Sequence, residues 1–515
     1  MLAAGGALAG RVAWPSGALA ALAGPPRTTL GVQRLGTLAR GARTVALARN
    51  ADLVGLTWSA AAGAHVQLRF RDAAGRFSPW VSAAAGSHGP DSAPRARGAS
   101  VGEPVWTGGT RLVQLRSDRA LADARLHVID VSAGAGASAL ALAAERSPLA
   151  RLAAASPPLA APVLQAGAGQ PPIIARAAWA RGEAPPRVAP EYGAVRLAFV
   201  HHTENPNGYL AGEVPAMLRA IFAFHRYVHG WNDIGYNFAI DAFGRIFEAR
   251  AGGVDEPVVG AHAGGYNLVS TGVAVLGSFS STPISTAARA TLQRLLAWKL
   301  ALHGVPSQGR VTVRVNPAGA VYSRFPANAR VSLPRIAGHR DGDSTDCPGD
   351  ALYGALPGVR AAVGRLAPSP TRATLALTTI APTPTPMPAP APEGTPPAPT
   401  PTPAAPTHTL SGTLALLAGA PVTGASVLIQ RRSVARRGEL VQERTLAQAV
   451  TDAAGNWSLP VALTPPSGRQ QVALRALYMG AAAGAGGQAG TGATVSEPLA
   501  IDAAALVPQP VTPAA

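Results

Sequence analysis

The residues best suited to chemistry are three side chains that could bind a metal ion. His201 and His202 end the apolar stretch VRLAFVHHT, which is typical of a buried strand. His339 and the chain's single cysteine, Cys347, lie eight residues apart on a loop rich in Gly and Asp. Zn²⁺ prefers imidazole and thiolate ligands, and a catalytic zinc site keeps three protein ligands and one open position. The sequence therefore predicts a zinc site built from His339, Cys347 and one histidine of the pair.

Each of these side chains has a simpler explanation when it is taken alone. A single cysteine cannot form an internal disulfide, and free cysteine is often a small buried side chain. Two other patterns carry less weight. His225 and His229 lie four apart on a predicted helix but lack the acidic residue of an HExxH motif. The G-x-S-x-G match at 98–102 lacks the strand and helix that flank a nucleophile elbow.

The segment that contains the candidate ligands, 171–368, alternates between strand-like and helix-like patterns. GVAVLGSF is typical of a buried strand, and IGYNFAIDAFGRIFEAR predicts two strands around a turn. Apolar residues recur with helical spacing over 213–229 and 287–303. We therefore expect a central α/β domain in which helices pack against a mixed β-sheet.

The regions on either side predict further domains. Residues 44–131 alternate apolar and polar side chains, which indicates a β-rich domain after a tail or poor signal segment at 1–43. Residues 132–170 form an Ala/Pro-rich linker, and the Pro/Thr-rich linker at 369–409 is expected to be a semi-rigid polyproline spacer. Short strands and turns over 410–505 resemble an Ig-like or transthyretin-like β-sandwich.

Charge and hydropathy restrict the partners. The 515 residues include 44 Lys and Arg against 27 Asp and Glu, a formal net charge of +17. A basic surface favours polyanions such as acidic cell-wall polymers. No run of basic residues interleaved with aromatic ones predicts nucleic-acid binding, and no apolar stretch of about 18 residues predicts a transmembrane span. We expect a monomer.

Four ordered motifs point to one family. VHHT, GWNDIGYNFAIDAFGRIFEAR, GAHAGGYNLVSTGVAVLGSF and IAGHRDGDSTDCPGDALY together resemble the peptidoglycan recognition protein and type-2 N-acetylmuramoyl-L-alanine amidase family, which includes T7-type lysozymes. The resemblance covers about 173–366, less than half of the chain. It implies a zinc amidase domain whose metal ligands here are His201, His339 and Cys347.

The resemblance also implies roles for other residues. Tyr236 matches a tyrosine whose hydroxyl donates to the developing oxyanion, and Thr345 matches a residue that orients water or substrate. Three positions match residues that line the peptidoglycan groove: His225, His262 and Asn267. A longer hairpin-like segment at 305–335 departs from the family pattern and is expected to cover one end of that groove.

The implied function is zinc-dependent hydrolysis of the amide between N-acetylmuramic acid and L-alanine in bacterial peptidoglycan, for cell-wall remodelling or lysis. The alternative is a non-catalytic protein that only binds peptidoglycan. Members that only bind typically lack the zinc cysteine, so Cys347 favours the enzyme. Such a substrate implies an extracellular or cell-wall-associated bacterial protein.

Overall fold

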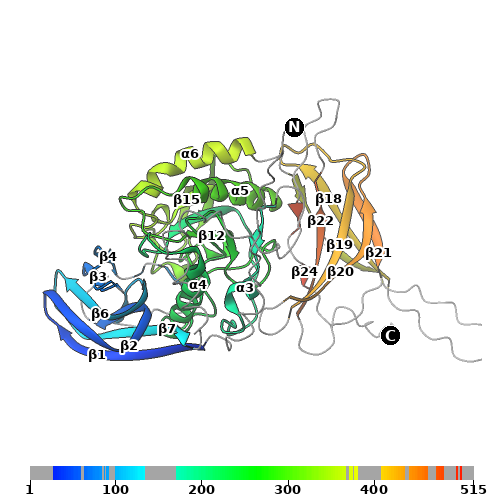
Figure 1. Ribbon diagram of the computed structural model, residues 1–515. Helices are drawn as coiled ribbons and strands as arrows, with labels where there is room; N and C mark the ends of the chain where they lie inside the picture. Colours follow the sequence, from blue (N-terminus) through cyan, green and yellow to red (C-terminus); the bar gives the residue numbers. More distant parts are fainter. Residues whose placement is uncertain are drawn as a thin grey trace, which may run out of the picture.

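The computed structural model shows three domains in chain order (Figure 1). It describes residues 27–59, 63–72, 74–83, 86, 88–91, 99–133, 170–366, 371–374, 376–380, 407–434, 440–461, 471–480, 494–496 and 499–500. The first 26 residues of the predicted tail, most of the Ala/Pro-rich linker and the proline-rich part of the second linker lie outside these ranges. The multidomain architecture predicted from the sequence is confirmed.

The N-terminal domain is an antiparallel β-sheet of seven strands. Their order is β1-β7-β2-β6-β3-β4, and β5 pairs with β2. The sheet starts at residue 27, inside the predicted tail, because the alternating stretch before residue 44 pairs along its length with the last strand of the domain. The bounds are β1 Arg27–Leu38, β2 Gly41–Ser59, β3 Val66–Phe70, β4 Val81–Ser82, β5 Ala99–Val101, β6 Val105–Ser117 and β7 Leu121–Ala133.

The central domain contains the predicted mixed sheet, in the order β15-β9-β12-β10-β11-β8. All neighbours are parallel except β10 and β11, which form the predicted hairpin. Each residue of β9 and β12 is buried, as expected for parallel strands covered on both faces. The bounds are β8 Ile173–Ile174, β9 Leu197–His202, β10 Phe238–Ile240, β11 Ile246–Glu248, β12 Ser270–Val275 and β15 Ile336–Gly338.

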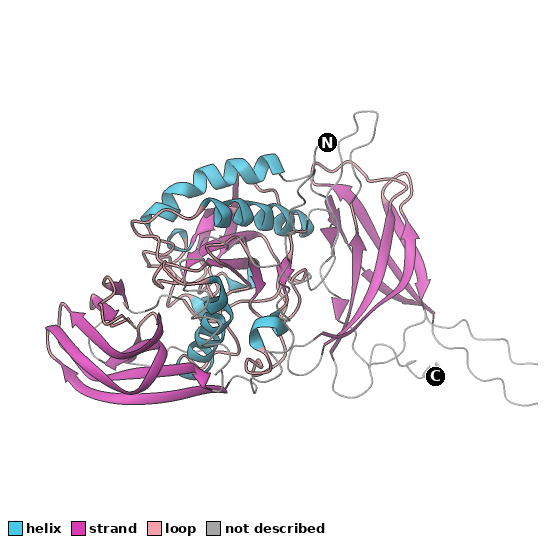
Figure 2. Ribbon diagram, in the orientation of Figure 1, coloured by secondary structure: helices cyan, strands magenta, loops and turns pink. Residues whose placement is uncertain are grey.

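Helices cover both faces of this sheet (Figures 1 and 2). One apolar cluster joins the sheet to α5 (Thr286–Leu302) and α6 (Asp350–Leu366). A second cluster joins the opposite face to α3 (Arg176–Ala180) and α4 (Val214–Ala223), which continues as a π-helical turn at Phe224–Val228. Single turns lie at Ala211–Glu213, Asn267–Val269, Pro317–Gly319 and His339–Asp341. Among the described residues, no helix has the length and apolar character that crossing a membrane requires.

The segment at 305–335 forms a hairpin, as predicted. β13 (Arg310–Arg314) pairs with β14 (Arg330–Pro334), and their valine side chains pack on the outer end of the sheet. The loop between the strands turns back toward the sheet, and Tyr322 on that loop approaches Gly264 closely. The hairpin therefore adds a wall beside the loop that connects β11 to β12.

The C-terminal domain consists of two β-sheets that share one apolar cluster. One sheet contains β16 (Thr371–Ala373), β17 (Ala376–Ile380), β18 (Thr407–Leu416) and β21 (Asn456–Val461). The other contains β19 (Ser426–Val434), β20 (Leu440–Val450), β22 (Gln471–Tyr478), β23 (Thr494–Val495) and β24 (Leu499–Ala500). Residues 371–380 were predicted to be linker but pair with β18. This stretch precedes the first proline of the repeat at residue 382, so its backbone N–H groups are free to form ladder hydrogen bonds.

Both flanking domains are packed against the central one. Leu53, Trp106 and Ile129 of the N-terminal sheet belong to the same apolar cluster as α4. Gly55 lies so close to Phe224 that a Cβ atom would stand 2.0 Å from its ring. On the opposite side, buried Arg475 of the C-terminal domain forms an ion pair with Asp255. The three domains therefore share buried interfaces, which bring N-terminal side chains close to the central sheet.

Candidate metal centre

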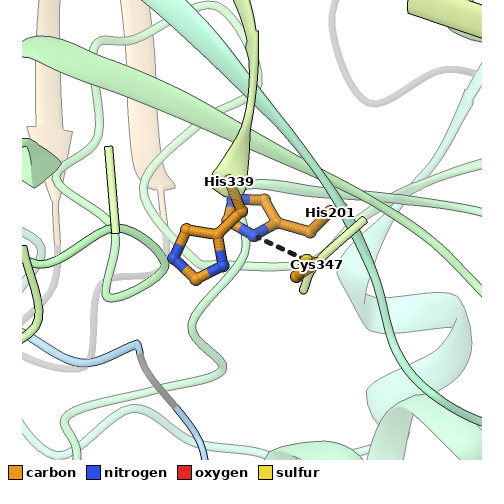
Figure 3. Close-up of side chains that lie close together, drawn as sticks. All are labelled: His201, His339 and Cys347. Carbon is orange, nitrogen blue, oxygen red and sulfur yellow. Dashed lines mark hydrogen bonds between the residues drawn. The ribbon is translucent and has the colours of Figure 1, made fainter. Parts of the chain in front are cut away.

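Three predicted ligands meet at one edge of the central sheet. His201 is the penultimate residue of β9, and His339 follows β15, the parallel neighbour of β9, so both side chains lie at the carboxyl ends of adjacent strands. Cys347 lies on the loop that leads into α6. One ligand atom from each residue lies within 4.8 Å of the others, and all three side chains are buried (Figure 3).

The orientation of His201 is fixed from two sides. Its Nε2 lies 3.2 Å from Nδ1 of His262, and its Nδ1 lies 3.8 Å from Sγ of Cys347. A hydrogen bond from Nε2–H to His262 leaves Nδ1 unprotonated toward the cysteine, which is the form that binds metal. The ring is fully buried, and burial lowers its pKa well below the usual range.

His339 is held by a carboxylate. Its Nε2 lies 2.9 Å from Oδ2 of Asp343, which also accepts a 3.0 Å hydrogen bond from the backbone N–H of Gly264. Histidine ligands of metals commonly donate their second N–H to such a carboxylate. The other nitrogen of His339, Nδ1, is buried and has no hydrogen-bond partner among the residues that the structure describes. A buried nitrogen without a partner is costly, and a metal ion would satisfy it.

Cys347 completes the donor set. Its Sγ accepts a 3.4 Å hydrogen bond from the backbone N–H of His202. Burial raises the pKa of the Cys347 thiol well above its usual range, whereas the metal-bound form is a thiolate. Binding of a cation therefore includes release of the thiol proton. The donor set, two imidazoles and one sulfur, suits Zn²⁺ better than the hard cations Mg²⁺ and Ca²⁺.

His202 points away from this cluster. Its Nε2 forms a 2.8 Å ion pair with Glu204, and its Nδ1 accepts a 3.4 Å hydrogen bond from the backbone N–H of Phe279. Successive side chains of a strand point to opposite faces, which explains why only one histidine of the pair can face His339. The structure therefore selects His201 from the two alternatives that spacing left open.

Tyr236 and Thr345 lie close to the triad. The Tyr236 ring centroid is 5.4 Å from that of His201, and burial raises its pKa far above the usual range, so its hydroxyl remains a donor. The Thr345 hydroxyl accepts a 3.1 Å hydrogen bond from the backbone N–H of Cys347. Thr345 therefore helps to position the cysteine on its loop.

The three predicted groove residues are all buried. His225 Nδ1 accepts a 3.1 Å hydrogen bond from the backbone N–H of Gly235, and its ring lies 4.5 Å from that of Trp231. His262 lies behind His201 and is fully buried. Asn267 Oδ1 accepts hydrogen bonds from the backbone N–H groups of His262 and Ala263, at 2.8 and 3.1 Å. These contacts shape the wall of the site.

Two N-terminal residues near the triad were missed by the sequence reasoning. His88 is 5.6 Å from the His339 ring and 6.5 Å from the His201 ring, centroid to centroid. Its Nε2 lies 3.4 Å from Glu103, a carboxyl whose pKa burial and nearby Glu204 raise to about 8. Neither residue stands in a motif, and both precede β9 by about a hundred positions. No sequence signal identifies them, because contacts between domains do not produce a periodic pattern of apolar and polar residues.

Fold and site together define a class of protein, an α/β domain with a buried His-His-Cys cluster at the carboxyl ends of parallel strands. Residues 191–350 match the family model described as N-acetylmuramoyl-L-alanine amidase. Residues 18–148 match a second model, described as Rv3811 N-terminal galactose-binding domain-like.

The relatives agree with the first match. The chain is 30% identical over 156 residues to peptidoglycan-recognition protein SC2 of Drosophila simulans, which spans 30% of this chain and 69% of that protein. It is 31% identical over 160 residues to N-acetylmuramoyl-L-alanine amidase of Homo sapiens, which spans 31% of this chain and 23% of that protein. The chain therefore belongs to the family of N-acetylmuramoyl-L-alanine amidases and peptidoglycan-recognition proteins, as its motifs predicted.

Solved structures with a similar domain include Drosophila PGRP-LB, at 24% identity over 36% of this chain and 91% of that one, with a TM-score of 0.28. A second is the amidase endolysin LysCS of Clostridium intestinale, at 20% identity over 37% of this chain and 95% of that one, with a TM-score of 0.27.

Proposed function

We propose that this protein is a zinc-dependent N-acetylmuramoyl-L-alanine amidase that hydrolyses the bond between N-acetylmuramic acid and L-alanine in bacterial peptidoglycan. The observation that carries the proposal is the convergence of His201, His339 and Cys347 in a buried cluster within a domain of this family. The relatives named for this activity supply the substrate class.

The residues of the triad would hold the ion through Nδ1 of His201, Nδ1 of His339 and Sγ of Cys347. Zn²⁺ bound there supplies Lewis acidity, which polarises an amide carbonyl and lowers the pKa of water. The chain's own contribution is orientation. His262 and Asp343 fix the two imidazole rings, and burial keeps bulk water away from the ligands.

Tyr236 and Thr345 act beside the ligands in this proposal. The Tyr236 hydroxyl stays protonated and donates a hydrogen bond to the negative charge that develops on the amide oxygen. Thr345 orients water or substrate and supports Cys347 through the hydrogen bond to its backbone N–H.

The groove residues divide into two groups. We assign His225 and His262 to the wall that supports the site, since both are buried and hydrogen-bonded to neighbouring groups. We assign Asn267 to direct contact with peptidoglycan, because, among the described residues, its side-chain NH₂ is not used within the central domain's wall but donates to the backbone carbonyl of Gly89 in the N-terminal domain.

The flanking domains support a role at the cell wall. We propose that the two C-terminal sheets form an Ig-like or transthyretin-like β-sandwich and that the basic chain contacts acidic wall polymers rather than nucleic acid. The protein would act as a monomer outside the bacterial cytoplasm, where its substrate lies.

A peptidoglycan-binding protein without activity is the competing function, and the cysteine separates the two. Digestion of a purified soluble muropeptide with zinc-loaded protein should release a peptide with a free L-alanine amino group, slowly in the wild type and not at all with chelator or with Cys347→Ser. Tight muropeptide binding without any release of peptide, in protein with full zinc occupancy, would refute the enzyme.

A further inference from the structure

A short segment of the N-terminal domain is inserted beside the metal centre. This inserted segment, residues 88–91, belongs to the connection between β4 and β5. Its first residue, His88, is 6% exposed, and its ring lies within 6.5 Å of five rings of the central domain, centroid to centroid. These are the rings of His201, His225, Trp231, Tyr236 and His339. Nε2 of His88 also lies 3.4 Å from the Tyr236 hydroxyl.

At the other end of the inserted segment, the carboxylate of Asp91 binds the wall of the predicted groove, which contains Asn267. Oδ1 of Asp91 accepts hydrogen bonds from the backbone N–H of Gly265 at 2.7 Å and from Nδ2 of Asn267 at 3.0 Å. Oδ2 accepts a longer one, 3.4 Å, from Nδ2 of Asn316 on the hairpin loop. Asp91 is 9% exposed, so these donors replace the water that the carboxylate loses.

The backbone of the inserted segment fits the same wall. The carbonyl oxygen of Gly89 accepts a 2.8 Å hydrogen bond from Nδ2 of Asn267. A Cβ atom on Gly89 would stand 2.5 Å from Oη of Tyr322 and 2.6 Å from its Cζ, so a side chain there would have to displace the Tyr322 ring. The side-chain amide of Asn267 therefore already donates to the protein's own chain, at the place where we expect it to contact substrate.

Buried contacts between the N-terminal and central domains hold the insertion in place. The sheet that carries it packs on α4 through Leu53, Trp106 and Ile129, and the backbone N–H of Trp106 donates a 2.7 Å hydrogen bond to Asn205, close to the end of β9. A tethered segment has a high effective concentration at its binding site. The hydrogen bonds of Asp91 and Gly89 then suffice for it to compete with a substrate in solution.

We propose that residues 88–91 are an intramolecular occupant of the peptidoglycan groove, which must leave before a stem peptide or glycan can bind there. This inference rests on the proposed function, since it assigns the groove to peptidoglycan. The structure, with the segment in the groove, then shows the resting form. Substrate binds only the molecules from which the segment has left, so the apparent affinity equals the intrinsic affinity multiplied by the fraction of those molecules.

Two variants loosen the segment by different means. Asp91→Ala removes the carboxylate that accepts from Gly265 and Asn267, and Gly89→Val places a side chain against Tyr322. Asp118→Ala is the matched control, since it removes a carboxylate from an exposed turn of the same domain. All three are made in the full chain, and their circular dichroism spectra are compared with the wild type.

The first measurement is binding of a soluble muropeptide to metal-free protein, which cannot turn it over. Because a hydrogen bond to a charged group is worth roughly tenfold to hundredfold in an equilibrium constant, both variants should bind at least about tenfold more tightly than the wild type and the control. Equal binding by all four proteins, or weaker binding by the two variants, would overturn the proposal. Weaker binding would show that the segment is part of the substrate site.

The second measurement needs no substrate. Cys347 is the only cysteine, so the rate at which a thiol reagent labels metal-free protein reports access to the metal centre. Labelling should be faster in both variants than in the wild type and the control, and an unchanged rate would count against the insertion as a barrier. If both variants are labelled faster but none of the four proteins binds muropeptide, residues 88–91 do cover the metal centre, and the proposed function is refuted instead.

Discussion

Replacing Asp343 with alanine tests the geometry of the metal centre most finely. Asp343 is 1% exposed, and its Oδ2 lies 2.9 Å from Nε2 of His339 and 3.0 Å from the backbone N of Gly264. The variant keeps all three ligands but removes the group that fixes one imidazole ring. Loss of such a partner typically costs tenfold to hundredfold in metal affinity, which is about 1.4 to 2.7 kcal/mol.

The same substitution has a second effect of calculable size. The buried N–H of Gly264 would lose its acceptor, which costs roughly 1 to 3 kcal/mol of the free energy of unfolding. Zinc affinity is measured by competition with a chromophoric chelator, and stability by urea denaturation of metal-free protein. Asp346→Ala is the control, because Asp346 lies exposed on the same loop. Unchanged zinc affinity in a folded Asp343→Ala protein would refute the assignment of His339 Nδ1 as the ligand atom.

Four further predictions concern other parts of the molecule. Cys347→Ser should keep its fold but lose zinc and amidase activity. His202→Gln should keep one zinc per chain by elemental analysis, and loss of zinc in this variant would make His202 the ligand in place of His201. Arg475→Ala removes the guanidinium that pairs with buried Asp255 and Glu256 and should lower the free energy of unfolding by roughly 3 to 5 kcal/mol in urea, while exposed Arg289→Ala should change little. Burial lowers the pKa of His127 below 6.5, so the folded chain binds fewer protons than the unfolded chain in acid and stability should fall as the pH drops below about 6.5. In the His127→Gln variant the free energy of unfolding should fall less steeply with decreasing pH, and a pH profile identical to that of the wild type would contradict a lowered pKa of His127.

Local patterns together with the family resemblance predicted the metal ligands. β9 is apolar and ends in two histidines, and His339 and Cys347 share one short loop. The structure adds that β15 is the parallel neighbour of β9, which brings the two groups together. The residues alone left His201 and His202 open, and the family resemblance chose His201. The alternation of side chains along β9 explains why His201 faces His339 while His202 pairs with Glu204. The carboxylate at Asp343 was visible in the sequence, but its contact with His339 depends on the turn between them.

Contacts between domains were beyond prediction from the sequence. His88, Asp91 and Glu103 lie in stretches without periodicity. They contact the central domain, His88 and Glu103 near the metal centre and Asp91 at Asn267, because the N-terminal sheet packs on α4. The strands at 371–373 and 376–380 were missed because each has few residues and stands next to a proline-rich repeat. Pairing with a long strand, β18, stabilises them where their own pattern does not.

The most direct test of the amidase is the chemical identity of the new end groups in digested peptidoglycan. Purified sacculi are treated with the zinc-loaded wild type, the Asp91→Ala variant and Cys347→Ser, and the soluble products are analysed by mass spectrometry after labelling of amino groups. We predict peptides with a newly free L-alanine amino terminus, more with Asp91→Ala than with the wild type and none with Cys347→Ser. Products that carry new reducing sugar ends instead, or no L-alanine amino terminus from any zinc-loaded protein, would contradict the proposed activity.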